Sequence, residues 1–360
     1  MSTDTSAGPT TAPGRLGDPA LTIGTDPRAD PRMVAVLAAL GIDGHADGAP
    51  LTPAASREEL LGFVDAVEVG FEGLFTALAE GSPPLDGVTS ELVTITGDGG
   101  HEIRLHIHRP AASEGPLPCI YQVHGGGMVM LATEGPLYTR WRLELAAAGA
   151  VVVGVEYRNG AGVLGPHPFP SGLEDCAAGL RWVASHRDEL GITSVVVTGD
   201  SGGGNLALAL AIKAKREGWV GEISGVYAQC PYIHGAWADA DLASLRENDQ
   251  YWLNRGLFPL LAEVYDPGAR HADDPTCWPY RATVVDIEGL PPHVISCNEL
   301  DPLRDEGLAY HRLLLRAGVS SVGRVNPGLC HVGELLFRGA MPDVYAAAVR
   351  DVTGFARSLA

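Results

Sequence analysis

Two patterns of apolar residues follow one another along the chain. From Asp26 to about Glu80, apolar residues recur at spacings of three and four, as in 33–37 and 60–64, which is the pattern of amphipathic helices. From about residue 90 to the C-terminus, short apolar runs alternate with helical segments. The first region should therefore form helices that precede a sheet built by the second.

A hairpin is predicted where this sheet begins. Residues 92–95 and 103–108 flank the glycine-rich turn 97–100, and their alternating pattern is typical of a half-exposed antiparallel edge. Six continuous apolar runs follow, and such runs are typical of strands buried on both faces in a parallel sheet. We expect these strands at 119–123, 150–155, 195–198, 223–228, 294–297 and 322–325.

The alternation of strands and helices predicts an α/β fold with a mostly parallel central sheet and helices on both faces. Ligands of such sheets bind beyond the carboxyl ends of the strands. Residues 232–267 interrupt the alternation with aromatic and polar residues. We expect this segment to pass over the ligand-binding face and to contribute to a cap with the N-terminal helices. A helix packed on the sheet without a part in binding is the alternative.

Composition argues against several kinds of partner. The 360 residues carry a formal net charge of −19 at pH 7, which repels nucleic-acid phosphates and anionic membranes. No apolar stretch reaches the roughly 18 residues that suggest a membrane span, and residues 1–19 show no signal segment. The six cysteines include no Cys-x-x-Cys pair, which argues against a zinc site or a redox dithiol. We expect a cytoplasmic protein that binds neither nucleic acid nor membrane and holds its thiols reduced.

Candidate chemistry begins with two glycine-rich segments, HGGG at 124–127 and GDSGGG at 199–204, each of which follows a β-branched apolar run. A serine between glycines, after a strand and before a helix, is the layout of a nucleophile elbow. In this turn the serine hydroxyl projects away from the backbone. Ser201 is therefore the candidate nucleophile.

Asp301 and His331 follow Ser201 in the order Ser, Asp, His, which is the order of the triad in α/β-hydrolases. A serine hydroxyl attacks only when a base removes its proton. A neutral imidazole can take that proton and return it to the leaving group, and a carboxylate on its other nitrogen fixes the ring tautomer. We predict that His331 is the base and Asp301 the acid.

Attack on an ester carbonyl places negative charge on the carbonyl oxygen, which requires donors that are already in place. Successive glycines let backbone N–H groups turn inward, and an amide beside the nucleophile lies at a helix N-terminus. We predict an oxyanion hole made by Gly126, Gly127 and Gly202.

Two other carboxylates near these residues have alternative roles. Asp305 is a second candidate for the acid, although its place in a predicted helix favours a salt bridge or a dipole interaction. Asp200 adjoins the nucleophile and is expected to hydrogen-bond backbone rather than take a direct part in catalysis.

Several histidine and cysteine side chains are also candidates for a metal site or for a part in catalysis. His106 and His108 lie on one face of a strand but lack a third ligand nearby, so we expect exposed hairpin residues rather than a metal site. Cys330 should be buried packing rather than a second nucleophile. His124 should hold the glycine loop through a hydrogen bond rather than transfer protons.

Four blocks resemble the hormone-sensitive-lipase-type family of α/β-hydrolase carboxylesterases: the two glycine-rich segments, HPFP at 167–170 and DPLRDEG at 301–307. The resemblance spans about residue 90 to the end, and it implies the same triad, the same oxyanion hole and a cap that includes the N-terminal helices. Two places depart from it. Val332 follows His331 where the family usually has glycine, and residues 159–166 differ from the usual sequence of the family.

The resemblance and the pattern together predict three parts. Residues 1–20 should form a disordered tail, 21–85 a helical cap region and 86–360 the α/β-hydrolase catalytic core.

We predict a serine carboxylesterase that cleaves short- to medium-chain esters or lactones through an acyl-enzyme, without metal or organic cofactor, and that can form a homo-oligomer. An amide, carbamate or aryl-formamide hydrolase is the first alternative, because the same triad serves those bonds. A ligand-binding receptor of the same fold is the second, and the presence of all three triad residues disfavours it. Activity should rise with pH as His331 loses its proton.

Overall fold

A computed structural model describes residues 18–237 and 240–360, and its centre is one eight-stranded sheet. The strand order is β1-β2-β4-β3-β5-β6-β7-β8. The first two pairings, β1 with β2 and β2 with β4, are antiparallel, and all later pairings are parallel. The strands are β1 (Val88–Thr96), β2 (Glu102–Pro110), β3 (Leu117–Val123), β4 (Val151–Glu156), β5 (Ile192–Asp200), β6 (Gly225–Gln229), β7 (His293–Asn298) and β8 (Ser321–Asn326).

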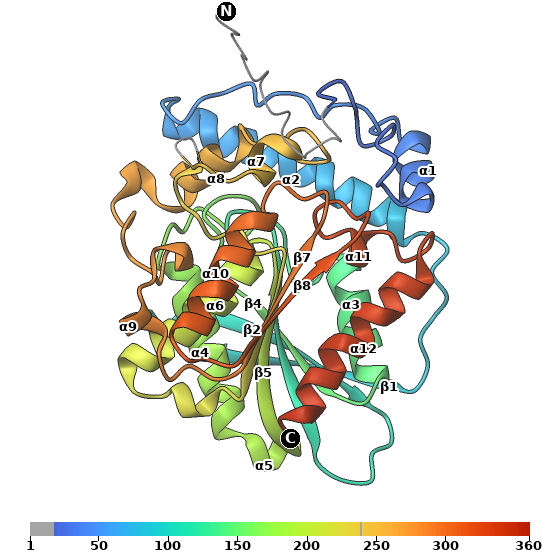
Figure 1. Ribbon diagram of the computed structural model, residues 1–360. Coiled ribbons are helices and arrows are strands. Elements are labelled where there is room, and N and C mark those ends of the chain that lie inside the picture. The colour runs from blue at the N-terminus through green and yellow to red at the C-terminus, as the bar shows by residue number, and fades with distance from the viewer. Residues whose placement is uncertain (1–17, 238–239) are drawn as a thin grey trace, which may run out of the picture.

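Helices cover both faces of the sheet, so the predicted α/β architecture is confirmed (Figure 1). One face carries α4, α6 and α10, and the other carries α3, α11 and α12. The helices are α1 (Pro31–Ala39), α2 (Arg57–Ala79), α3 (Pro136–Ala147), α4 (Ser171–Ser185), α5 (Arg187–Leu190), α6 (Gly202–Glu217), α7 (Ser244–Glu247), α8 (Leu257–Tyr265), α9 (Val284–Ile287), α10 (Arg304–Arg316), α11 (Gly333–Leu336) and α12 (Pro342–Ser358).

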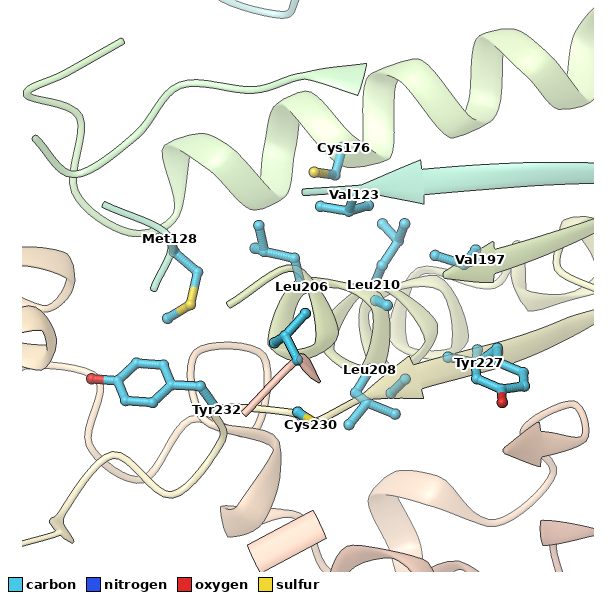
Figure 2. Packing of buried hydrophobic residues seen from close by; sticks show 14 of the residues in the cluster. Val123, Met128, Cys176, Val197, Leu206, Leu208, Leu210, Tyr227, Cys230 and Tyr232 are labelled. Carbon is cyan, nitrogen blue, oxygen red and sulfur yellow. The ribbon is translucent and has the colours of Figure 1, made fainter. Parts of the chain in front are cut away.

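The core is densest around α6, the helix that follows the candidate nucleophile. In Figure 2, Leu206 and Leu210 lie toward Val123 of β3, whereas Leu208 lies toward Cys230 just after β6. All five side chains are fully buried. Residues 202–212 of α6 are buried on every side, so this part of the helix is held firmly by the core beneath the site at its N-terminus.

The N-terminal helical region contains two helices, α1 and α2, as the pattern predicted. Helix α1 begins after Asp30, whose side chain accepts a hydrogen bond from the Arg32 N–H, and α2 begins after Ser56, which forms a reciprocal capping box with Glu59. Residues 40–56 between them are not helical. The expected tail at 1–20 falls almost entirely outside the described residues.

The excursion at 232–267 contributes α7 and α8, which lie together with α1 and α2 at one end of the sheet (Figure 1). Helices α2 and α8 contact each other there. In the described part of the chain, no helix is long and apolar enough to cross a membrane.

The strand predicted at 322–325 is present as β8, but the prediction that it is buried is wrong. Val322 and Val325 of β8 are 49% and 45% exposed. Strand β8 is the last strand of the sheet and has a neighbour on one side only, so its apolar residues are incompletely covered. Continuous apolar sequence therefore predicted the strand but not its burial.

Candidate active site

Ser201 lies at the tight turn between β5 and α6, with φ of 54° and ψ of −118°. A positive φ is unfavourable for a residue with a side chain, and it is typical of a strained functional turn. Backbone bonds hold the serine there: its N–H donates to Gln229 O at 2.9 Å, and its carbonyl accepts from the Tyr232 N–H at 3.1 Å. The predicted elbow geometry is thus present.

Close packing explains the glycines around this turn. A Cβ added to Gly202 would lie 2.6 Å from Gly127 N, and one added to Gly203 would lie 2.3 Å from Val123 O. Only glycine lets the start of α6 come this near to the loop after β3. The turn thus brings two segments 75 residues apart in sequence (202 − 127 = 75) into contact.

Asp301 and His331 follow β7 and β8, and they meet at the same end of the sheet. His331 Nδ1 lies 2.8 Å from Asp301 Oδ2, and both side chains are buried. The other oxygen of Asp301 accepts the Leu303 N–H at 2.9 Å, which fixes the carboxylate. Burial alone lowers the pKa of His331, but the charge and hydrogen bond of Asp301 outweigh it, so the net pKa lies above the usual 6.5.

The HGGG loop turns sharply after β3. Gly126 has φ of 97°, and its carbonyl accepts hydrogen bonds from the N–H groups of Val129 and Met130, both at 3.1 Å. A Cβ at Gly126 would lie 2.1 Å from Met130 O, so this position excludes every other residue. The three predicted oxyanion-hole glycines, Gly126, Gly127 and Gly202, are brought together here.

A hydrogen-bonded chain links the two glycine-rich segments. The Gly125 N–H donates to the Tyr138 hydroxyl at 2.9 Å, and this hydroxyl donates to Asp200 Oδ2 at 3.1 Å. The Asp200 side chain was expected to bond backbone, and besides a bond with its own backbone it accepts the Tyr138 hydroxyl. Burial raises the pKa of Asp200 to about 7.

Ser201, His331, Gly126 and Gly127 all line one pocket, which encloses about 670 Å³ including its mouth. Almost all of the remaining wall is aromatic or aliphatic, and part of it comes from α2, from α8 and from the residues just before α8. The sequence prediction placed Trp252 and Phe258 over this face as part of the segment 232–267, but nothing local distinguishes the residues of α2 from core residues. The wall residues include Phe71, Phe75, Trp252, Leu253, Leu257 and Phe258.

Asp305, the alternative candidate for the acid, has a structural role. Asp305 lies in the first turn of α10, where it accepts the Ser244 N–H and the Arg304 guanidinium, both at 2.8 Å. It therefore joins α7 to α10, as the expected salt bridge implied. Cys330 is buried as expected.

One group of possible metal ligands occurs among the described residues. Ligand atoms of Cys230, Asp301 and His331 lie within 4.8 Å of one another. Burial raises the pKa of the Cys230 thiol well above its usual value, and a protonated thiol is a poor ligand. The His331 nitrogen nearest the carboxylate is also occupied by the hydrogen bond to Asp301.

The expectation that His106 and His108 are exposed is wrong. His108 is buried, and its Nδ1 lies 2.8 Å from the Ser90 hydroxyl. Burial lowers the pKa of both histidines, for His108 to about 4. Strand β2 lies inside the sheet, between β1 and β4, rather than at its edge.

His124 holds the glycine loop, as expected. Its Nδ1 lies 2.8 Å from Gly125 O, and its ring stacks on Tyr157 with centroids 4.2 Å apart. Burial lowers its pKa to about 3, so the ring is neutral at ordinary pH.

The two departures from the family pattern both lie at this site. Val332 has φ of 56° and lines the pocket beside His331. Residues 159–166 pack against the loop after HGGG: the Gly160 and Ala161 N–H groups donate to Met128 O and Val129 O at 3.0 and 2.9 Å.

Comparisons with known proteins show which family the chain belongs to. A family model described as α/β hydrolase fold matches residues 120–334. Carboxylesterase NlhH of Mycobacterium tuberculosis (strain ATCC 25618 / H37Rv) is 34% identical over 278 residues, which cover 74% of this chain and 82% of the relative. Brefeldin A esterase, described as a bacterial homologue of human hormone-sensitive lipase, superposes with a TM-score of 0.92 at 46% identity, covering 96% of this chain and 98% of that chain. Esterase Est22 superposes with a TM-score of 0.83 at 38% identity, covering 93% and 98%.

Proposed function

The chain belongs to the hormone-sensitive-lipase-type α/β-hydrolase family and is a carboxylic ester hydrolase, and from this premise we propose that it cleaves short- to medium-chain esters or lactones with Ser201 as nucleophile. The observation that carries the proposal is the shared pocket. Ser201, His331 and two loop glycines border it, and its other walls are mostly apolar.

In the proposed reaction, His331 removes the proton of the Ser201 hydroxyl as the oxygen attacks the ester carbonyl. The imidazolium that forms is stabilised by Asp301, and it returns the proton to the departing alcohol oxygen. Water then attacks the acyl-enzyme with His331 again as base, which releases the acid and restores Ser201. In a lactone the alcohol remains attached to the acyl group, so ring opening follows the same steps.

The oxyanion of each tetrahedral intermediate is proposed to accept hydrogen bonds from the N–H groups of Gly126, Gly127 and Gly202. Support comes from the contact between the start of α6 and the loop, which brings these amides to one end of the pocket. The same amides lie near the positive end of the α6 dipole.

We further propose that residues 21–85 and 232–267 act together as a cap over this pocket. Support comes from its lining, since Phe71 and Phe75 belong to α2 while Leu257 and Phe258 belong to α8. The apolar walls of this pocket suit the hydrocarbon parts of a small ester or lactone. The pocket favours uncharged esters or lactones over charged ones, because a charge would lose its hydration there.

The test is hydrolysis of p-nitrophenyl esters from acetate to palmitate, with Ser201→Ala and the exposed control Ser185→Ala measured beside the native enzyme. We expect turnover of the shorter chains, loss of activity in Ser201→Ala and native activity in Ser185→Ala. Labelling by a fluorophosphonate should likewise require Ser201. An active Ser201→Ala variant would exclude the proposed nucleophile, and a preference for palmitate would exclude the proposed substrate range.

A further inference from the structure

A buried carboxylate on the cap helix α2 contacts the loop that carries the oxyanion-hole glycines. Glu68 is only 4% exposed, and its Oε1 accepts the Leu131 N–H at 2.6 Å. Its Oε2 accepts the Val163 N–H at 2.9 Å. Burying a carboxylate is costly unless its oxygens are hydrogen-bonded, and both oxygens here are bonded to backbone.

The contact falls on a strained part of the loop. Met128 and Leu131 have φ of 62° and 75°, values that side-chain-bearing residues rarely adopt. On the other side of Leu131, its carbonyl accepts the Asn159 amide N–H at 2.6 Å. Side chains from two distant segments therefore hold the Leu131 backbone at both its N–H and its carbonyl.

Leu131 directly follows the turn that carries Gly126 and Gly127. The N–H groups of Val129 and Met130 donate to Gly126 O, so the residues from Gly126 to Met130 form one hydrogen-bonded unit to which Leu131 is joined by the next peptide bond. A shift of Leu131 would move this unit and with it the amides of Gly126 and Gly127. Displacements of about 1 Å at a catalytic group reduce rates by roughly a hundredfold.

The second oxygen of Glu68 supports the same unit indirectly, through its bond to Val163. Val163 belongs to residues 159–166, whose N–H groups at Gly160 and Ala161 donate to Met128 O and Val129 O. Glu68 thus joins the cap helix to the loop directly and also through this segment. The segment departs from the family pattern at the place where it accepts this contact.

We propose that Glu68 is a positioning residue, which holds the oxyanion-hole loop in its working geometry and so makes catalysis depend on the docking of the cap helix α2. This inference rests on the proposed function, because it requires the loop amides to bind the oxyanion. Glu68 itself touches no reacting atom in the scheme.

The test uses Glu68→Gln, which keeps the shape but turns an amide NH₂ toward one of the two N–H groups. We expect kcat to fall by about tenfold or more with KM within about twofold, since the loss falls on the transition state. Affinity for an alkyl boronic acid, which forms a tetrahedral serine adduct, should fall by the same factor as kcat. Affinity for a ground-state ligand, the product alcohol, should not change.

Asp65→Asn is the matched control, because Asp65 lies one turn earlier on α2 and contacts Gly162 N at 3.2 Å without reaching Leu131. It should keep native kcat and boronate affinity. A lower melting temperature of Glu68→Gln with native kcat and boronate affinity would overturn the proposal, as would a rise in KM alone. If Glu68→Gln does not fold, Glu68→Asp, which keeps the charge but is shorter, decides by the same readouts. Full activity of Ser201→Ala would instead defeat the proposed function, so the two failures are distinguishable.

Discussion

The two sides of the pocket are held in different ways. On one side, Ser201 directly follows β5, whereas Asp301 and His331 lie three and five residues beyond the ends of β7 and β8. Backbone groups hold Ser201 and Asp301, and Asp301 in turn holds His331. On the side of Gly126 to Leu131, the loop is held by Glu68 of α2 and by Asn159, which lie far away in sequence.

This difference teaches where the precision of each side originates. Buried strand ends cannot move without disrupting the core, so Ser201 and Asp301, which follow the buried strands β5 and β7, are held by the sheet itself. His331 is held through its hydrogen bond to Asp301. The loop side contains several left-handed residues and keeps its shape only while its outside partners remain in place. Substitutions on the acid–base side of Ser201, Asp301 and His331 should therefore remove most of kcat. Substitutions on the loop side should lower kcat by smaller factors.

The largest effect is expected on the acid–base side. Asp301→Asn should lower kcat by about 10⁴-fold, because an amide no longer stabilises the imidazolium or fixes the tautomer of His331. Asp305→Asn should leave kcat within a few-fold of native, since Asp305 bonds Ser244 and Arg304 rather than His331. Steady-state kinetics of both variants decide, and a larger loss in Asp305→Asn would transfer the role of the acid to Asp305.

A smaller loss is expected on the loop side. Gly126→Ala places a Cβ 2.1 Å from Met130 O, so the loop must shift, and kcat should fall by about 10²- to 10³-fold. Gly100→Ala is the control, because Gly100 also has a positive φ, of 78°, but stands in open space at a hairpin turn. It should lower the melting temperature without changing kcat. Equal kcat values for the two variants would contradict the role given to the loop.

Local pattern predicted the acid–base side because its residues sit in short motifs after strands. The elbow at Ser201 and the order of Asp301 and His331 are visible in the sequence, and the structure brings all three to one end of the sheet. The hydrophobic pattern likewise predicted every strand, although it missed the exposure of β8 and the burial of His108. These errors share a cause, since neighbours in a sheet are set by topology rather than by local sequence.

The loop side was predicted only in part. HGGG indicated the donors, but nothing local marks Glu68 or Phe71 as part of the site. The sequence around them has the pattern of an ordinary amphipathic helix. Only the packing of α2 over the sheet brings Glu68 to the loop and Phe71 to the pocket. Contacts between such distant segments have no signature in a single sequence.

On the acidic limb of the pH profile, kcat/KM should change by about tenfold per pH unit. This profile separates the acid–base side from the loop side. The pKa of His331 is raised, so kcat/KM should increase with pH through a limb centred above 6.5. His124 on the loop side has a pKa of about 3 and remains neutral across that range.

Asp200→Asn sharpens this test. With a pKa of about 7, Asp200 is partly charged in this range, and that charge helps to raise the pKa of His331, so its removal should move the limb to lower pH. Kinetics of the native enzyme and the variant between pH 5 and pH 9 would measure the shift. A limb centred below 6.5 in the native enzyme would contradict the assignment of His331 as base.

The smallest effect is expected at Val332, where the acid–base side carries one left-handed residue of its own. A β-branched residue at a φ of 56° has a conformational cost of about 1–2 kcal/mol, which glycine avoids. Glycine in turn loses the buried side chain and gains freedom in the unfolded chain, which together offset that benefit. Val332→Gly should therefore change the free energy of unfolding by only about 1 kcal/mol, with kcat near native because the His331 loop depends on the sheet.

Val332→Ala provides the decisive comparison for this position. Alanine loses most of the side-chain contacts but keeps the penalty for a left-handed backbone, so it should be less stable than Val332→Gly. Elsewhere in regular structure alanine is the more stable of the two. Denaturant unfolding of both variants measures the order. Alanine above glycine would mean that this loop relaxes its backbone when the side chain is removed, and that the acid–base side is as adaptable as the loop that Glu68 holds.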